Sequence, residues 1–322
     1  MKILVLGGTQ FVGRAFVEAA LAAGDEPTLF HRGRTNAGLF PEVEHVIGDR
    51  DGGLAALGGR SWDACVDVSG YVPRLVGDAA RALHGRVGRY VFVSTISVYA
   101  DLSESRAEDG PLKTMEDETT EEIGPGTYGE LKVLCERVVS EVYGDQGTIV
   151  RPGYVIGPYD HTGRFPWWAH RAARGGEMIV PSTLARAFQA IDTRDLADFL
   201  LLRARSPLTG IFNATGPVPP ITMLDLLESA ATASDADLNL EVVDDSFLRE
   251  QGVESELPLW AGDDPDWAEW ASIDVRKAIG AGLTFRGIDD TVAATLSETG
   301  VVPGIGLEPD REAELLAAWH AR

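Results

Sequence analysis

The sequence predicts an α/β fold of the Rossmann type, a doubly wound parallel sheet with a smaller C-terminal lobe. Over the first half of the chain, short apolar runs typical of buried parallel strands alternate with helical patterns. A glycine-containing turn follows the first apolar run, and polar residues recur where the later runs end. The 322 residues are enough for one large domain with an added lobe.

The composition is that of a soluble globular protein, with 44% hydrophobic and 24% charged residues. A formal net charge of −22 argues against a nucleic-acid or anionic-membrane surface, because both need a basic footprint. No stretch reaches the ~18 apolar residues of a membrane span, and Met1 and Lys2 lead directly into a strand with no signal-peptide pattern. Cys65 and Cys135 lie in apolar patterns, as buried reduced thiols do. We therefore expect a cytoplasmic protein.

The first predicted strand, residues 3–6, leads into a turn at residues 7–13 and then a helix that ends at Gly24. Such a turn lets backbone N–H groups approach a phosphate at the helix N-terminus. Gln10 stands where a second phosphate-facing glycine is often found, and glycine turns also close βα units that bind nothing. The candidate phosphate-binding residues are Gly7, Thr9, Gln10, Phe11, Val12 and Gly13.

The second predicted strand, residues 27–30, ends at His31, Arg32 and Arg34. In dinucleotide-binding folds, an acidic residue here accepts from the ribose 2′-hydroxyl, whereas an arginine accommodates a 2′-phosphate. The arginines therefore favour NADP over NAD, although a basic solvent-exposed turn is an alternative interpretation.

Three further predicted strands also end in polar residues. Residues 44–47 precede Asp49 and Arg50; Asp49 could meet an adenine amino group or cap the following helix. Open α/β sheets bind ligands at the carboxyl ends of their strands. Residues 63–68 and 90–94 precede further candidate ligand residues, namely Ser69, Gly70 and Tyr71 after the first and Thr95 to Tyr99 after the second. The acidic residues 101–122 lack histidine and regular ligand spacing, so we expect a solvated loop and no metal site.

Tyr128 and Lys132 lie four residues apart in a helical pattern, which places both on one face about one turn apart. A free phenol titrates near ~10, and a nearby cation lowers that pKa toward neutrality. The pair is therefore suited to general acid–base chemistry, although the same spacing also occurs on solvated helix faces.

These motifs, in this order, resemble the extended short-chain dehydrogenase/reductase family, also called the NAD-dependent epimerase/dehydratase family. The resemblance covers about the first two thirds of the chain and includes the segments 151–158 and 191–197. It implies that Tyr128 is the general acid or base and that Lys132 tunes it and holds the nicotinamide ribose. It also implies that Thr95 bonds the reacting oxygen, with Ser94 and Ser97 as alternatives, and that Pro152, Tyr154 and Val155 line the nicotinamide pocket.

The same resemblance divides the chain into two domains. We expect an NAD(P)-binding domain over residues 1–160 and about 188–216, and a substrate-binding lobe over about 161–187 and 217–322. Trp167 and Trp168 could roof a substrate but more often fill a core or a subunit contact, and Arg171 and Arg174 form a predicted basic patch. We expect a lid or a loop that faces substrate around Trp260, Trp267 and Trp270, with a plain connector as the alternative.

The implied function is NAD(P)-dependent hydride transfer at a carbinol or carbonyl carbon of a small polar substrate, such as a nucleotide sugar. Ile96 and Ser97 replace the Asp-Glu pair of the family's dehydratases, which disfavours sugar dehydration and leaves epimerisation and carbonyl reduction. The alternatives are an NADPH-dependent ketone reductase and a catalytically silent dinucleotide-binding regulator. We expect NADP or NAD as cofactor, no nucleic-acid partner and no membrane association. Leu131 and Leu134 fit either a core or a homodimer contact.

Overall fold

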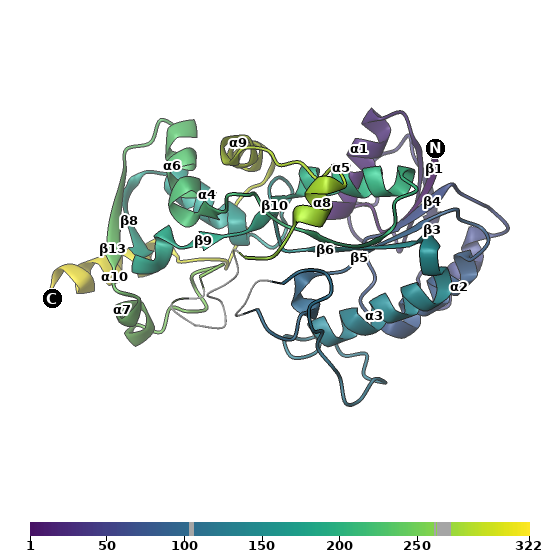
Figure 1. The fold of residues 1–322 in the computed structure, drawn as a ribbon. Coiled ribbons are helices and arrows are strands. Elements are labelled where there is room, and N and C mark those ends of the chain that lie inside the picture. Colours follow the sequence, from purple (N-terminus) through teal and green to yellow (C-terminus); the bar gives the residue numbers. More distant parts are fainter. Residues whose placement is uncertain (103–105, 261, 263–271) are drawn as a thin grey trace. The chain divides into compact units, whose positions relative to one another are not determined.

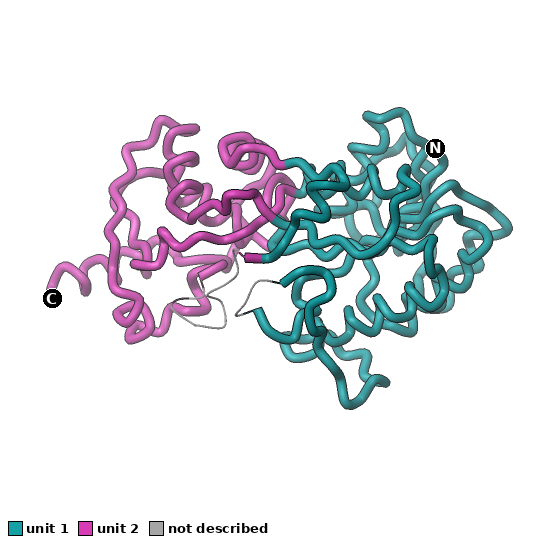
Figure 2. The backbone as a smooth tube through the Cα atoms, in the orientation of Figure 1, with its two compact units in different colours: residues 1–155, 193–215, 273–284 teal, residues 156–192, 216–272, 285–322 magenta. Residues whose placement is uncertain are grey.

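The computed structural model describes residues 1–102, 106–260, 262 and 272–322. The chain forms two compact units (Figure 2). Unit 1 contains residues 1–155, 193–215 and 273–284, and unit 2 contains residues 156–192, 216–272 and 285–322.

Unit 1 contains a seven-stranded sheet in the order β11-β6-β5-β4-β1-β2-β3, with every neighbouring pair parallel. Its strands are β1 (Lys2–Leu6), β2 (Glu26–His31), β3 (Glu44–Ile47), β4 (Ala64–Asp67), β5 (Tyr90–Val93), β6 (Gly147–Pro152) and β11 (Gly210–Ala214). The strand order reverses between β1 and β4, which is the point where doubly wound sheets bind ligands. The predicted fold class is thereby confirmed.

Helices cover both faces of this sheet (Figure 1). The helices of unit 1 are α1 (Phe11–Ala22), η1 (Leu54–Leu57), α2 (Pro73–Leu83), η2 (Ile96–Val98), α3 (Tyr128–Tyr143), η3 (Gly144–Gln146), α5 (Thr193–Arg205) and α8 (Arg276–Gly280). Helices α1 and α5 pack together on one face, and α2 and α3 pack together on the other (Figure 1). The four central strands are almost fully buried, which explains their continuous apolar sequences.

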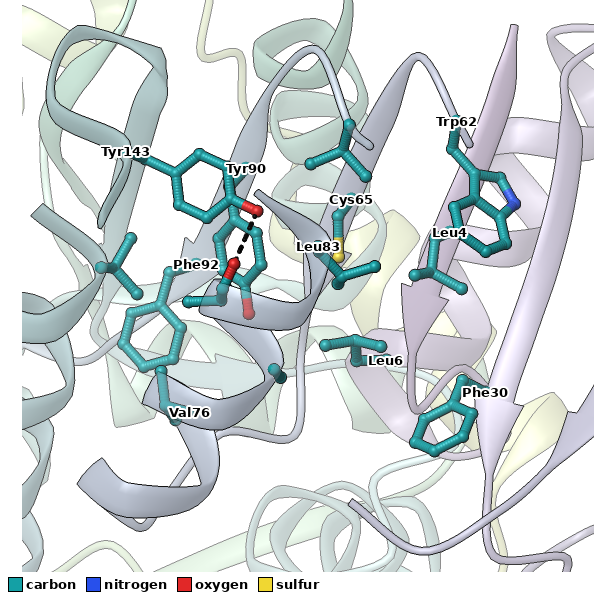
Figure 3. Packing of buried hydrophobic residues seen from close by; sticks show 14 of the residues in the cluster. Leu4, Leu6, Phe30, Trp62, Cys65, Val76, Leu83, Tyr90, Phe92 and Tyr143 are labelled. Carbon is teal, nitrogen blue, oxygen red and sulfur yellow. Dashed lines mark hydrogen bonds between the residues drawn. The ribbon is translucent and has the colours of Figure 1, made fainter. Parts of the chain in front are cut away.

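The core beneath α2 and α3 joins strand and helix side chains in one cluster (Figure 3). Leu4, Leu6 and Phe92 reach it from the sheet, and Val76 and Cys135 reach it from the helices. At its edge the Tyr143 hydroxyl donates to the Ala80 carbonyl at 3.1 Å and joins the end of α3 to α2 (Figure 3).

Residues 273–284, which the sequence analysis places in the smaller lobe, pack in unit 1. Ile273 and Val275 join the buried cluster around Tyr99, and the Asp274 amide donates to the Arg106 carbonyl at 2.9 Å. Helix α8 packs beside the edge strand β11. The contacts with Tyr99 and Arg106 join residues more than 160 positions apart, and those of α8 with β11 join residues more than 60 positions apart, so the local pattern could not reveal them.

Unit 2 combines three packed helices with short sheets. Its elements are α4 (Arg164–Ala173), β8 (Gly176–Pro181), η4 (Ser182–Ala185), β9 (Ala187–Phe188), β10 (Ala190–Asp192), β12 (Ile221–Thr222), α6 (Met223–Ala233), β13 (Leu238–Val243), α7 (Asp245–Glu250), α9 (Ile288–Glu298) and α10 (Pro309–His320). Strand β7 (Tyr154–Ile156) spans the boundary between the units along the chain. Helix α6 begins at a capping box in which Thr222 and Asp225 bond each other's backbone amides.

Candidate functional site

The turn after β1 has the backbone that close approach to a phosphate requires. Gly7 and Gly8 have φ of +111° and +101°, a region that favours glycine. Helix α1 begins at Phe11, earlier than predicted, so Gly13 lies inside its first turn. A Cβ on Gly13 would lie 2.8 Å from the Gly8 nitrogen, so glycine is required for this packing. Gly8 was missed as a candidate, although the two adjacent glycines were a signal.

The N-terminus of α1 suits an anion. Gln10 is its exposed N-cap residue, no side chain caps it among the described residues, and its first turn has no acidic residue. Thr9 is buried and its carbonyl accepts from the Asn36 side chain at 2.9 Å, while Phe11 and Val12 are half-buried. The helix terminus can therefore offer backbone N–H groups to a phosphate.

The residues after β2 divide between buried and exposed positions. Arg32 and Arg34 are exposed, so both side chains are accessible to an anionic ligand. His31 is buried, and both of its ring nitrogens take part in hydrogen bonds, one with His45 and one with the Gly33 amide. Both nitrogens of the His31 ring are therefore bonded to other protein groups in this structure.

The residues after β3 have different environments. Asp49 is exposed and accepts from the Asp51 amide at 3.0 Å, so it forms a local turn; the next helix, η1, begins after Gly53. Arg50 pairs with the fully buried Asp67 at the end of β4, at 2.6 Å. The Arg50 Nη1 atom is buried and has no hydrogen-bond partner among the described residues, so it is an available donor.

Two neighbouring strands are tied together where the candidate site begins. The exposed Ser69 donates its hydroxyl to the Leu6 carbonyl at 2.9 Å, which joins the end of β4 to β1. Gly70 is buried, and a Cβ there would lie 2.7 Å from the Phe92 ring. The half-exposed ring of Tyr71 lies 6.4 Å from that of Tyr128, centroid to centroid.

Lys132 is the most enclosed of the candidate catalytic residues. Its Nζ atom donates to the carbonyls of Gly70 at 2.8 Å and Val93 at 2.6 Å, and it lies over the rings of Tyr71 and Phe92. Burial lowers the pKa of Lys132 to about 8, because the charged form is desolvated. An ammonium has three N–H donors, so two carbonyls leave one for a ligand within the described part of the site.

Glycine at position 129 brings the Tyr128 end of α3 against the segment that follows Thr95. A Cβ on Gly129 would lie 2.2 Å from the Ser97 carbonyl oxygen, so only glycine allows this contact. The Thr95 side chain accepts from the Ser97 amide at 3.1 Å and lies within hydrogen-bonding distance of the Ser97 hydroxyl. Helix α3 thus begins beside the Thr95 loop, a contact that the sequence analysis missed.

Helix α3 also takes part in a buried ionic network that the sequence analysis missed. Glu136, one turn after Lys132, forms two hydrogen bonds with Arg151 of β6, at 2.7 and 2.9 Å. The Ser94 hydroxyl donates to the same carboxylate at 2.5 Å. Arg151 also donates to the Tyr99 hydroxyl at 3.0 Å. The only signal in the sequence was a pair of charges within apolar patterns.

The residues predicted to line the nicotinamide pocket follow β6. Pro152 is its buried last residue, and Tyr154 and Val155 are half-buried. Between them, Gly153 packs so closely on Thr215 that a Cβ would lie 2.3 Å from the threonine hydroxyl. This segment therefore leaves the sheet at the same end as the residues after β4 and β5.

Other predicted residues have structural roles in unit 2. Trp167 and Trp168 are buried, which confirms the core interpretation. Arg171 is also buried and pairs with Glu312 at 2.7 Å, so the predicted basic patch is wrong at this position. Of the tryptophans expected near the substrate, Trp260 donates to Thr183 at 3.2 Å, whereas Trp267 and Trp270 lie outside the described residues.

Two further findings concern metal ions and membranes. In unit 2, Glu177, Glu241 and His320 have potential ligand atoms within 4.8 Å of one another. His320 lies 3.4 Å from Glu177, a distance that an ordinary ion pair also gives. Of the helices that the structure describes, none combines the length and the apolar character needed to cross a membrane.

The described residues of unit 1 fit a bound nicotinamide dinucleotide. The glycine turn and the α1 terminus can hold a pyrophosphate, and the buried donors of Arg50 and Lys132 face the same end of the sheet.

Leu131 and Leu134 of α3 are buried within the chain, so they belong to its own core.

Known proteins are similar to this chain in sequence and in fold. Residues 64–214 match the family model of the NAD dependent epimerase/dehydratase family, a family of enzymes. The chloroplast stem-loop binding protein of 41 kDa b from Arabidopsis thaliana is 26% identical over 235 residues. That match covers 67% of this chain and 58% of the relative, so the chain spans less than two thirds of the relative's length.

Solved structures show the same fold over almost the whole chain. UDP-glucuronic acid 4-epimerase from Bacillus cereus, in complex with NAD, is similar with a TM-score of 0.68 and 15% identity, covering 92% of this chain and 98% of that one. MoeE5 in complex with UDP-glucose and NAD is similar with a TM-score of 0.65 and 17% identity, covering 93% and 98%. The resemblance inferred from the motifs is thus confirmed, since residues 64–214 of this chain match the model of the NAD dependent epimerase/dehydratase family.

Proposed function

We propose that this protein is an NAD(P)-dependent oxidoreductase of the epimerase/dehydratase type, with Tyr128 as its general acid or base. One observation carries the proposal: the buried ammonium of Lys132 is fixed on the carbonyls of Gly70 and Val93, one turn along α3 from Tyr128. A structural lysine would more commonly keep its charge in water. We infer that its charge serves the Tyr128 phenol, which precedes it by four residues on the same helix.

The proposed reaction separates a hydride from a proton. A nicotinamide held at this site would accept the hydride, and Tyr128 takes the proton from the substrate hydroxyl, so that a carbinol becomes a carbonyl. Lys132 stabilises the phenolate form of Tyr128, and the Thr95 hydroxyl donates to the reacting oxygen. Glu136 and Arg151 hold the ends of β5 and β6 against α3 and thereby keep these groups in register.

We propose a nucleotide sugar as the substrate class. The neighbouring structures are described as a UDP-glucuronic acid 4-epimerase and as a complex with UDP-glucose. Ile96 and Ser97 follow Thr95 and provide no second acid–base pair, which supports epimerisation or simple carbonyl reduction over dehydration. The choice between an epimerase and a reductase depends on whether the cofactor is regenerated within each catalytic cycle.

For the cofactor, the exposed Arg32 and Arg34 support NADP, because no acidic residue lies between positions 31 and 41 to accept from a ribose hydroxyl. Both neighbouring structures are described with NAD. A direct comparison of NADPH and NADH affinity decides between these two indications.

A non-enzymatic function is the second candidate, because the Arabidopsis relative is described as a stem-loop binding protein. The net charge of −22 opposes RNA binding through counterion release, which needs clustered lysine and arginine. A stem-loop RNA titration at low salt tests this candidate, and sub-micromolar binding would support it.

The experiment that tests the enzyme begins with mass spectrometry of whatever copurifies with the protein. The protein is then incubated with a panel of UDP-sugars and with small carbonyl compounds plus NADPH. An epimerase converts one UDP-sugar to its epimer with no net change in nicotinamide absorbance, whereas a reductase consumes NADPH stoichiometrically. No turnover with either panel and no bound dinucleotide would contradict the proposal.

A further inference from the structure

Two histidines form a chain of hydrogen bonds between β2 and β3. The Gly33 amide lies 3.0 Å from His31 Nδ1, and His31 Nε2 lies 2.8 Å from His45 Nδ1. His45 Nε2 lies 3.1 Å from the Phe40 carbonyl oxygen. The two rings are nearly perpendicular, with centroids 5.0 Å apart, so the second bond is an edge contact in which one ring nitrogen donates to the other.

The backbone groups at both ends determine the protonation of the rings. The Gly33 amide can only donate, so His31 Nδ1 must carry a lone pair, and the proton of the neutral ring is on Nε2. That proton is donated to His45 Nδ1, so the proton of His45 is on Nε2 and is donated to Phe40, whose carbonyl can only accept. All three bonds exist only when both imidazoles are neutral, because a second proton on either ring places two donors face to face.

This chain of hydrogen bonds, here called the His31–His45 relay, holds both ends of the connection between β2 and β3. Gly33 and Phe40 have φ of +70° and +59°, so the chain turns sharply where each is bonded. A third tie joins the middle of the connection to the glycine turn, since the Asn36 side chain donates to the Thr9 carbonyl at 2.9 Å. The exposed Arg32 and Arg34 are therefore carried on a segment fixed at three points.

We propose that the His31–His45 pair positions Arg32 and Arg34 for the phosphate on the adenosine ribose of NADP, and that it does so only in its doubly neutral form. This inference rests on the proposed function and extends it to the choice between the two cofactors. The histidines touch no ligand; they are positioning residues. A neutral relay in the place of an acidic side chain removes the group that would repel a 2′-phosphate.

The surroundings favour the neutral form. Burial, and then the neighbouring His45, lower the pKa of His31. Charged side chains on β1, β2, β3, the β2–β3 connection and α1, which packs on β2, are Lys2, Arg14, Glu18, Glu26, Arg32, Arg34, Glu42 and Glu44, and Asp49 and Arg50 follow β3. Glu18 bonds Arg14 at 2.9 Å and Glu44 bonds Arg60 at 3.0 Å. Because the folded pKa of His31 lies below its unfolded value of ~6.5, the relay stabilises the fold above that pH and is lost as the pH falls.

Two conservative variants separate the two bonds of His45. His45→Asn keeps an acceptor for His31 but removes the donor to Phe40, and His45→Gln does the reverse. His84→Asn is the matched control, since His84 is an exposed histidine after α2. We expect each His45 variant to weaken NADPH binding about tenfold and NADH binding by less than about threefold, in calorimetric titrations. His84→Asn should leave both affinities within about twofold of those of the original protein.

Long-range ¹H–¹⁵N NMR of the histidine rings tests the relay without any cofactor. At pH 7.5, His31 and His45 should both be neutral and protonated on Nε2. A protonated ring or an Nδ1–H tautomer at that pH would overturn the proposal. Unchanged NADPH affinity in both folded His45 variants, with normal binding by the original protein, would overturn only the positioning role. No dinucleotide binding by the original protein would overturn the proposed function and this role together.

Discussion

The ammonium of Lys132 lies 2.6 Å from the carbonyl oxygen of Val93. Val93 is two residues before Thr95, so a buried cation is bound to the strand end that leads to Thr95. A lysine with this degree of burial keeps its proton only while neighbouring carbonyls and rings compensate for lost water. The carbonyls of Gly70 and Val93 provide that compensation at the ends of two adjacent strands. The protonation of Lys132 should therefore be visible in both activity and stability.

Activity should fall as the pH rises through about 8, the pKa to which burial lowers Lys132. Above that pH the neutral amine no longer stabilises the phenolate of Tyr128. Lys132→Met should lower kcat/KM on the order of a hundredfold and remove this alkaline limb, whereas the exposed Lys277→Met should leave the profile unchanged. A pH profile of kcat/KM measures both effects, and an alkaline limb that persists in Lys132→Met contradicts the assignment.

The same pKa makes a prediction for stability. Between pH 8 and the ordinary lysine value of 10.5, the unfolded chain binds this proton and the folded chain does not. The contribution of Lys132 to the free energy of unfolding therefore rises with pH across this window and is lost as the pH falls. Urea denaturation of the original protein and Lys132→Met at several pH values should show this difference in slope, and parallel curves would refute it.

Tyr128→Phe should reduce kcat by about 10²–10⁴-fold and leave dinucleotide affinity nearly unchanged, because only the proton-transferring oxygen is removed. Tyr143→Phe is the matched control, since it removes a hydroxyl from the last residue of the same helix. That hydroxyl bonds the Ala80 carbonyl, so the control should lose about 1 kcal/mol of stability and retain kcat. Steady-state kinetics and cofactor titration measure the outcome; full activity in Tyr128→Phe would end the proposed role.

Glu136→Gln should destabilise the protein by about 3–5 kcal/mol, because it leaves the charge of Arg151 buried without its partner. Glu118→Gln removes the partner of Arg137, the next residue of α3, from an exposed pair and should change stability by less than about 1 kcal/mol. Replacing both Glu136 and Arg151 by leucine and methionine should recover much of the loss. Chemical denaturation of the four proteins measures these differences, and equal effects at the two sites would disprove the structural importance of the buried pair.

Gly129→Ala should lower both stability and kcat, because the new methyl group would lie 2.2 Å from the Ser97 carbonyl oxygen. We expect a cost of about 1–3 kcal/mol from the backbone shift, although alanine by itself favours a helix. Gly126→Ala is the control, since no atom lies within 4 Å of its added Cβ. If both variants behave like the original protein, the contact between α3 and the Thr95 loop does not position the site.

The sequence by itself determined the parallel sheet, the glycine turn and the shared face of Tyr128 and Lys132. These features follow from local periodicity: apolar runs bury strands, and a spacing of four places residues one turn apart. Even so, α1 begins at Phe11, whereas the sequence pattern predicted a start after Gly13. The packing of Gly13 on Gly8 is a contact that no periodicity encodes.

The tertiary structure alone decided which polar groups meet. Glu136 pairs with Arg151, 15 positions later in the chain, and His31 bonds His45, 14 positions later. Residues 273–284 pack in the same unit as the sheet whose first strand begins at Lys2. The physical reason is that a buried charge or imidazole is tolerated only beside a partner, and the partner is supplied by whichever strand or helix the fold places next to it. The sequence provided the groups, and the packing of the sheet gave each of them its partner.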